Sequence, residues 1–285
     1  MFLAVLTALA SASGFAVAMS CQHHASGRTP GAITTTPRAI MFLVSQPLWL
    51  LGAAIGFGSL LLHALALRLG ALAVVQPVMV SAIVLAVPVR AGLSRRLPRL
   101  EEMRAVSLTA GGLAVFLLTA HPAPSRSRPE AGRLLVVVLA AVAVSVVTAR
   151  LGSRCRDRVP QALFLGAAAG LLFGLTAALL KTVVQEVSDS GLVSLLTSWP
   201  LGALICVGVL GTALNQRAYR IAALSVSMPM LSVVEVLLAL ALGAALFGET
   251  PAHDPLALIV QALALACMVT GLWLVTRVPH RPSHA

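Results

Sequence analysis

Charged residues are scarce in this sequence of 285 amino acids. Only 10% of the residues are Asp, Glu, Lys or Arg, and a single lysine, Lys181, accompanies nineteen arginines. A typical soluble domain carries about 25% charged residues, so this deficit excludes an ordinary soluble globular protein. Hydrophobic residues make up 59% of the chain, and its mean hydropathy is +0.96. The composition therefore predicts a protein embedded in a membrane.

Cysteine is also sparse, and its spacing excludes the common cysteine-based sites. The four cysteines are Cys21, Cys155, Cys206 and Cys267, and no two of them form a CxxC pair. Scattered cysteines of this kind indicate neither a disulfide framework nor a zinc site. Cys21 lies near His23 and His24, the one local grouping of metal-ligand residue types, but it is too small to predict a metal site. We expect no bound metal and no cofactor.

Motifs for enzymatic chemistry and nucleic-acid binding are missing as well. The sequence contains no GxSxG, HExxH or P-loop motif, and its glycines lack the strand–turn–helix context that phosphate binding requires. The net charge of +11 comes from arginines in short gaps between apolar runs, without an aromatic-interleaved basic patch. We therefore expect neither an enzyme nor a direct ATP-driven pump, and no nucleic-acid partner.

The sequence does contain long apolar runs, each near the ~20 residues that cross a bilayer. They lie at about 2–20, 42–66, 71–89, 105–120, 134–149, 161–184, 192–214, 221–247 and 255–276. The predicted fold class is an all-α integral membrane protein with about nine transmembrane helices. The first run could instead be a cleaved signal peptide, because "ASA" at 10–12 resembles a cleavage site. No Lys or Arg precedes it, which favours a retained helix.

The arginines predict the orientation of the chain. Fifteen lie after the first, third, fifth and seventh runs or in the C-terminal tail, against four, with Lys181, on the other side. Basic residues concentrate in cytoplasmic loops, so the N-terminus is expected outside and the C-terminus inside. The lipid bilayer of the plasma membrane is the expected surrounding. The preference for Arg over Lys points to a GC-rich bacterial genome.

One stretch of sequence occurs twice. "RLGALAVVQP" at 68–77 matches "RIAALSVSMP" at 220–229, and "LAVFLLTAHP" at 113–122 matches "GLWLVTRVP" at 271–279. The two copies begin the third and eighth runs, and this odd separation makes the runs antiparallel. Such inverted repeats are typical of secondary transporters. The predicted organisation is a first repeat of four helices (1–122), a linker with the fifth helix (123–158), a second repeat of four helices (159–278) and a cytoplasmic tail (279–285).

These residues resemble the drug/metabolite transporter superfamily, and within it the NIPA-type magnesium transporter branch. The similarity covers nearly the whole chain. The matching residues are Trp49, Gly52, Gly70, Pro77, Gln216, Arg217, Ala218, Ile221, Ser225, Pro229, Phe247 and Glu249. Two acidic positions of that branch are replaced, one by Ser59-Leu60 and the other by Arg95 and Arg96. Glu235 followed by Val236 is similar instead to the Glu-Pro site of the superfamily's general permeases.

Glu235 is the leading candidate for a functional residue. It lies near the middle of the eighth run, where an ionised acid costs about 2.5–3.5 kcal/mol on insertion scales. Ser225 and Ser232 lie on roughly the same helical face. The carboxylate could couple transport to a proton or cation, bind substrate, or serve as a buried structural acid.

Further polar residues interrupt the apolar runs. Lys181 could line a cavity or extend to the outer interface, and His63 could titrate or simply pack. Helix–helix hydrogen bonding is the alternative to substrate binding for the remaining candidates, which are Gln76, Ser81, Asn215 and Gln216. The spacing of Gly166, Gly170 and Gly174, and of Gly52 and Gly56, predicts close helix packing, for which a homodimer is one use.

Three functions remain open at this point. The first is a multi-pass transporter that moves a small solute or cation by alternating access, as the resemblance implies. The second is a magnesium or other divalent cation transporter of the NIPA type. The third is a non-transporting membrane subunit. A hard divalent cation prefers anionic oxygen ligands, and Glu235 is the single carboxylate expected deep in the membrane, which favours the first function.

Overall fold

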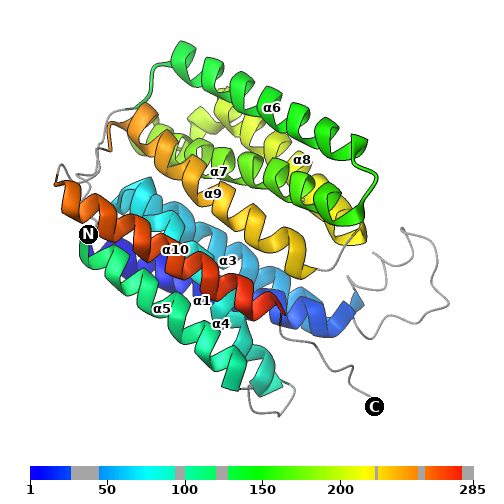
Figure 1. Ribbon diagram of the computed structural model, residues 1–285. Helices are drawn as coiled ribbons and strands as arrows, with labels where there is room; N and C mark the ends of the chain where they lie inside the picture. The colour runs from blue at the N-terminus through cyan, green and yellow to red at the C-terminus, as the bar shows by residue number, and fades with distance from the viewer. Residues whose placement is uncertain (27–44, 94–99, 120–127, 222–223, 250–253, 278–285) are drawn as a thin grey trace.

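The computed structural model describes residues 1–26, 45–93, 100–119, 128–221, 224–249 and 254–277, which form a bundle of helices without a strand among them (Figure 1). With the labels of Figure 1, the helices are α1 (Phe2–Ser26), α3 (Pro47–Leu69), α4 (Leu72–Leu93), α5 (Leu100–Thr119), α6 (Ala131–Arg154), α7 (Arg158–Ser190), α8 (Trp199–Ile221), α9 (Leu224–Phe247) and α10 (Pro255–Arg277), with a short 3₁₀ helix, η1 (Leu192–Thr197). In this described part, nine helices are long and apolar enough to cross a membrane. The predicted all-α membrane class is confirmed at this level.

The helices extend beyond the apolar runs into polar sequence. The run at 134–149 becomes α6, which takes in Arg133, Arg150 and Arg154. Long arginine side chains can place their charge at the interface while the backbone stays helical. Hydropathy therefore marks the lipid-spanning part of a helix, and the helix itself is longer.

One predicted boundary is wrong by about two turns. The seventh run was expected to begin near 192, but residues 192–197 form η1 and α8 begins at Trp199. Pro200 explains this start, because proline has no N–H to donate and is tolerated in the first turn of a helix but not in its interior.

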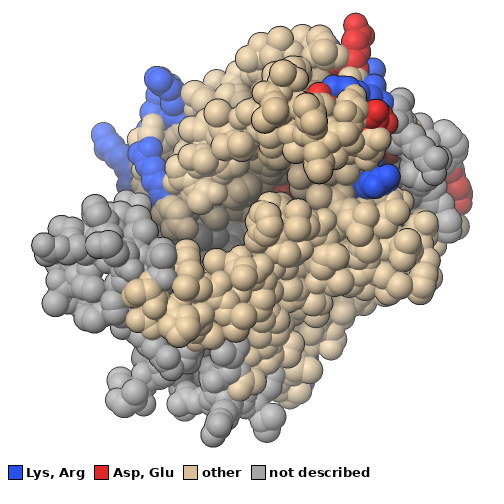
Figure 2. Space-filling model, turned by 180° about the vertical axis from the view of Figure 1, so that it is seen from behind, with Lys and Arg blue, Asp and Glu red and all other residues tan. Residues whose placement is uncertain are grey.

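Consecutive helices cross the bundle in opposite directions, so that α1, α4, α6, α8 and α10 end on the side where Figure 1 marks the C-terminus. Figure 2 shows basic side chains gathered at that end of the visible face without acidic side chains beside them, and basic side chains mixed with acids at the other end. Apolar side chains such as Leu118, Leu139 and Val209 are exposed around the sides of the bundle. These sides match the hydrocarbon of a bilayer.

Two groups of helices pack in the same way. In one group α1 contacts α3 and α4, and in the other α7 contacts α8 and α9. Helices α5 and α10 contact each other and join the groups, while α6 packs on the outside against α7. Figure 2 shows a hollow between the upper and lower parts of the molecule on the face opposite to α10.

Glycines bring α7 against the backbone of α9. A Cβ atom on Gly166 would lie 2.6 Å from the carbonyl oxygen of Ser227, and one on Gly174 would lie 2.8 Å from that of Glu235. Gly170, between them, faces the Leu231 carbonyl just as closely. The predicted close packing is confirmed, and its partner is α9 of the same chain. A homodimer stays a prediction.

Candidate functional site

The end of α9 turns back into the protein and meets the turn between α3 and α4. Gly248 follows the helix with φ +63°, a conformation that favours glycine. The N–H of Glu249 then donates to the Gly243 carbonyl at 3.0 Å, which fixes the reversal of the chain. As a result the Glu249 side chain points inward, and only 2% of the residue is exposed.

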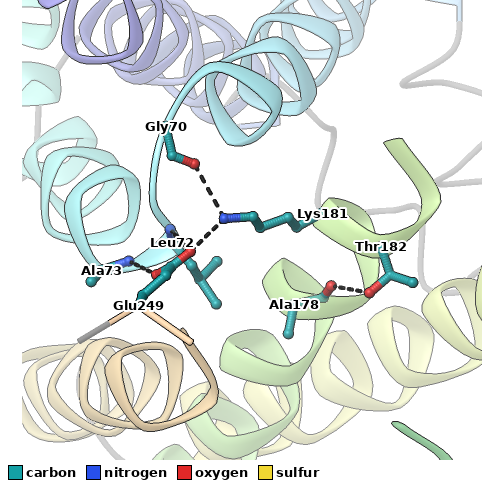
Figure 3. Close-up of polar contacts among 7 residues, drawn as sticks. All are labelled: Gly70, Leu72, Ala73, Ala178, Lys181, Thr182 and Glu249. Carbon is teal, nitrogen blue, oxygen red and sulfur yellow. Dashed lines mark hydrogen bonds and ion pairs between the residues drawn. The ribbon is translucent and has the colours of Figure 1, made fainter. Parts of the chain in front are cut away.

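Glu249 caps the first turn of α4. Its Oε1 accepts a hydrogen bond from the N–H of Leu72 at 2.9 Å, and its Oε2 accepts one from the N–H of Ala73 at 3.0 Å (Figure 3). The first N–H groups of a helix have no partner within the helix, and the positive end of the helix dipole favours a carboxylate there. An acid from the second half of the chain thus caps a helix of the first half.

Lys181 completes this site from α7. Its Nζ forms an ion pair with Oε1 of Glu249 and donates a hydrogen bond to the Gly70 carbonyl at 3.3 Å (Figure 3). It also lies 4.7 Å from the centre of the Phe247 ring, within the range of a cation–π contact. Lys181 is 2% exposed, so the alternative in which it extends to the outer interface is wrong. The pair links α3, α4, α7 and α9.

Sequence reasoning missed the role of Glu249. The predicted apolar run 221–247 ends at Phe247, which leaves Glu249 outside the predicted helix. The usable signals were the Phe-x-Glu match noted with the family resemblance and the adjacent Gly248. Neither of these signals predicts that Lys181, which lies 68 residues away in the sequence, is the partner of Glu249.

Glu235 differs from Glu249, because no side chain or backbone group in the described part of the structure pairs with it. It is the twelfth residue of the 24 in α9 and is half-buried. Its backbone lies against Gly170 and Gly174 of α7. Among the described residues, no donor or cation contacts its carboxylate. A carboxylate in the middle of a membrane helix without a fixed partner is available for a proton, a cation or a substrate.

Gln76 is the most enclosed of the other candidates. It is 1% exposed, and in the described structure neither its amide nitrogen nor its amide oxygen has a hydrogen-bond partner. The Ser227 hydroxyl on α9 is likewise fully buried, and no described residue is its hydrogen-bond partner. Leaving a buried polar group unpaired costs about 1–3 kcal/mol, so such groups at the centre of a bundle mark a place where a polar ligand can bind.

Helices α4 and α9 run antiparallel and bring some of these positions to similar depths. Ala73 lies beside Gly243, and Val80 shares an apolar cluster with Val236. In this register Ser81 lies at about the depth of Glu235. Gln76 lies between that level and the Lys181–Glu249 pair.

The remaining candidates differ in burial and hydrogen bonding. The His63 Nε2 and Asn215 Oδ1 atoms are buried and have no hydrogen-bond partner among the described residues, as is the case for Oε1 of Gln185, a residue that the sequence did not single out. Ser81 donates to the Val78 carbonyl at 2.6 Å on its own helix, and Ser232 is buried. Gln216 is exposed. The side chains of Ser225, His23 and His24 lie outside the described part of the structure.

The described residues contain no grouping of three His, Cys, Asp or Glu side chains that could hold a metal ion. In the described part of the structure Glu249 is bound to Lys181, Glu186 pairs with Arg128, and no partner contacts the Glu235 carboxylate. The arrangement defines a polytopic helical membrane protein with ionisable groups enclosed between its helices.

Comparison with known proteins gives a bacterial relative that matches over nearly the whole chain. The chain is 30% identical over 284 residues to the uncharacterized protein Cgl0250/cg0304 of Corynebacterium glutamicum, and the alignment covers 99% of this chain and 97% of that protein. The chain therefore belongs to the same family as this bacterial protein. No family model matches the chain, and no solved structure gives a significant match.

Proposed function

We propose that this protein is a secondary transporter of the drug/metabolite type that moves a small solute or cation by alternating access. Two inverted four-helix repeats, α1–α5 and α7–α10, would rock about a site between them, with α6 as the linker. Glu235 would be the coupling or substrate-binding carboxylate, with Gln76 as a polar contact. The unpaired Glu235 is the observation that carries this proposal.

The helix boundaries support the inverted repeat. Helix α3 ends at Leu69 and α4 begins at Leu72, while α8 ends at Ile221 and α9 begins at Leu224. These pairs occupy the same places in the repeated sequences at 68–77 and 220–229. In each half the repeated sequence thus lies where two consecutive antiparallel helices meet, and α3 and α8 run in opposite directions.

The contact between α5 and α10 is reciprocal, as a two-fold relation requires. A Cβ on Gly112 of α5 would lie 2.7 Å from the Ala264 carbonyl oxygen of α10. A Cβ on Gly271 of α10 would lie 2.7 Å from the Ala105 carbonyl oxygen of α5. Each helix presents a glycine to the backbone of the other, as expected when a pseudo-two-fold axis passes between them.

The contrast between the two acids explains why Glu235 is the proposed site. Both carboxylate oxygens of Glu249 accept hydrogen bonds and one of them pairs with Lys181, so its charge is balanced and serves packing. Glu235 lacks such donors, and its ionised form is stable only when a cation, proton or substrate is present. Proton and substrate can then compete for one carboxylate, and each occupant can favour a different orientation of the repeats.

Proteoliposomes test the proposal. The purified protein is reconstituted and screened against a panel of amines, amino acids and small organic cations, with and without an imposed pH gradient. We expect gradient-driven uptake of at least one compound by wild type, and its loss in Glu235→Gln with substrate exchange retained. Glu130→Gln is the matched control, since it makes the same change at an exposed acid at the start of α6.

Two results would contradict the proposal. Transport by Glu235→Gln equal to wild type across the pH range would assign the acid a structural role. Absence of uptake across the whole panel, with correctly folded protein in the liposomes, would favour the non-transporting subunit.

A further inference from the structure

A groove runs between α6 and α8 on the outside of the second group of helices, with α7 as its floor. Its volume is about 200 Å³. The residues that line it are Val142, Ser145, Val146, Ala149, Arg150 and Ser153 of α6, Leu172 of α7, and Leu210, Leu214 and Arg217 of α8. It lies apart from Glu235 and from the Lys181–Glu249 pair, so the proposed transport site does not account for it.

The groove has the length of one membrane leaflet. Its α6 wall extends from Val142 to Ser153, a rise of about 17 Å, and half of the hydrocarbon core measures about 15 Å. Val146 and Leu210 on its two walls are exposed at the surface of the bundle. The one hydroxyl deep in it, on Ser145, donates to the Ala168 carbonyl at 2.9 Å, so the walls present apolar surface to an occupant.

One end of the groove is cationic. Arg150 and Arg217 come from different helices and both line it, whereas no carboxylate does. Both are exposed, and in the described structure neither has an ion-pair partner. They lie at the arginine-rich end of the bundle, where α6 and α8 finish (Figures 1 and 2).

We infer that this groove binds an acidic phospholipid of the surrounding leaflet. An acyl chain would lie along the apolar walls, and the phosphate would contact the two guanidinium groups. Arginine matches phosphate oxygens in geometry and charge, and basic pockets between transmembrane helices are suited to anionic headgroups. A soluble phosphate would use only the cationic end and leave the apolar length uncovered, which favours a lipid.

Native mass spectrometry of the delipidated full-length protein tests this inference. The protein is titrated with phosphatidylglycerol, with phosphatidylcholine of the same acyl chains, and with inorganic phosphate alone. The double variant Arg150→Gln/Arg217→Gln removes the proposed contacts. Arg154→Gln/Arg156→Gln is the matched control, because it removes equal charge from exposed arginines near the same end that do not line the groove. Ala149→Trp fills the groove and keeps both charges.

We expect wild type to retain one phosphatidylglycerol per chain in preference to phosphatidylcholine. The Arg150/Arg217 variant should bind roughly 30-fold more weakly, because each arginine near a lipid headgroup contributes about a fivefold factor. The control variant should stay within about twofold of wild type, and Ala149→Trp should lose binding. Equal loss in the control, equal binding of phosphatidylcholine, or displacement of the lipid by inorganic phosphate would each overturn the inference.

Discussion

Removing Glu249 should destabilise the protein more than removing its partner Lys181. Glu249→Ala leaves the N–H groups of Leu72 and Ala73 without their acceptor, and it leaves the buried Lys181 ammonium without its counter-ion, with only the Gly70 carbonyl as a partner. Breaking a buried pair on one side costs about 3–5 kcal/mol, and each orphaned N–H adds about 1 kcal/mol or more. We expect a loss of about 5 kcal/mol or more in the free energy of unfolding.

Lys181→Met should cost less, about 3 kcal/mol, at the lower end for a broken buried pair. Glu249 keeps both backbone hydrogen bonds and the favourable end of the α4 dipole. In the double variant Lys181→Met/Glu249→Ala no buried charge is left unpaired. Its loss should therefore be smaller than the sum of the two single losses, and smaller than that of Glu249→Ala alone.

Steric trapping in detergent micelles measures these free energies at equilibrium, with the exposed Glu130→Ala as the control variant. The order expected is Glu249→Ala, then the double variant and Lys181→Met, then Glu130→Ala near wild type. Additive losses in the double variant, or a greater loss in Lys181→Met than in Glu249→Ala, would refute the capping and pairing described above.

Three further predictions follow from the bundle. Cysteines placed at 94–100 should resist an impermeant thiol reagent added outside, whereas cysteines at 250–254 should react, because the arginine distribution and the proposed inverted repeat predict opposite sides for these two segments. Equal labelling would contradict the proposed repeat. Gly170→Leu should force α7 and α9 apart and destabilise the protein by about 1–3 kcal/mol. In size-exclusion chromatography of heated samples, its monodisperse peak should be lost at a lower temperature than that of wild type. Gly202→Leu, whose side chain meets open space, should keep the wild-type temperature. Magnesium uptake should not exceed that of empty liposomes, because Glu235 lacks a second free carboxylate to share the ion; growth rescue of a magnesium-transport-deficient cell would show otherwise.

The apolar runs were sufficient to predict the helices. A backbone in hydrocarbon must satisfy its hydrogen bonds within the segment, so a run of this length has essentially one conformation available. The glycine spacing on α7 was also readable, because Gly166, Gly170 and Gly174 form one face whatever surrounds them. Helix starts such as Trp199 were missed where a local proline mattered more than hydropathy.

Only the tertiary structure decided which face of each helix packs against which neighbouring helix. Gly170 predicts a close contact, but its partner, the Leu231 carbonyl on α9, depends on how the helices assemble. The pairing of Lys181 with Glu249 could likewise not be predicted from the sequence. The hydropathy pattern placed Lys181 near the end of the run 161–184 and Glu249 just beyond the run 221–247, because a single charged side chain is more stable in water than in an apolar environment. Their burial became favourable only when folding brought the lysine, the carboxylate and the free N–H groups of α4 together, and that proximity between residues far apart in the chain is not encoded in any local pattern.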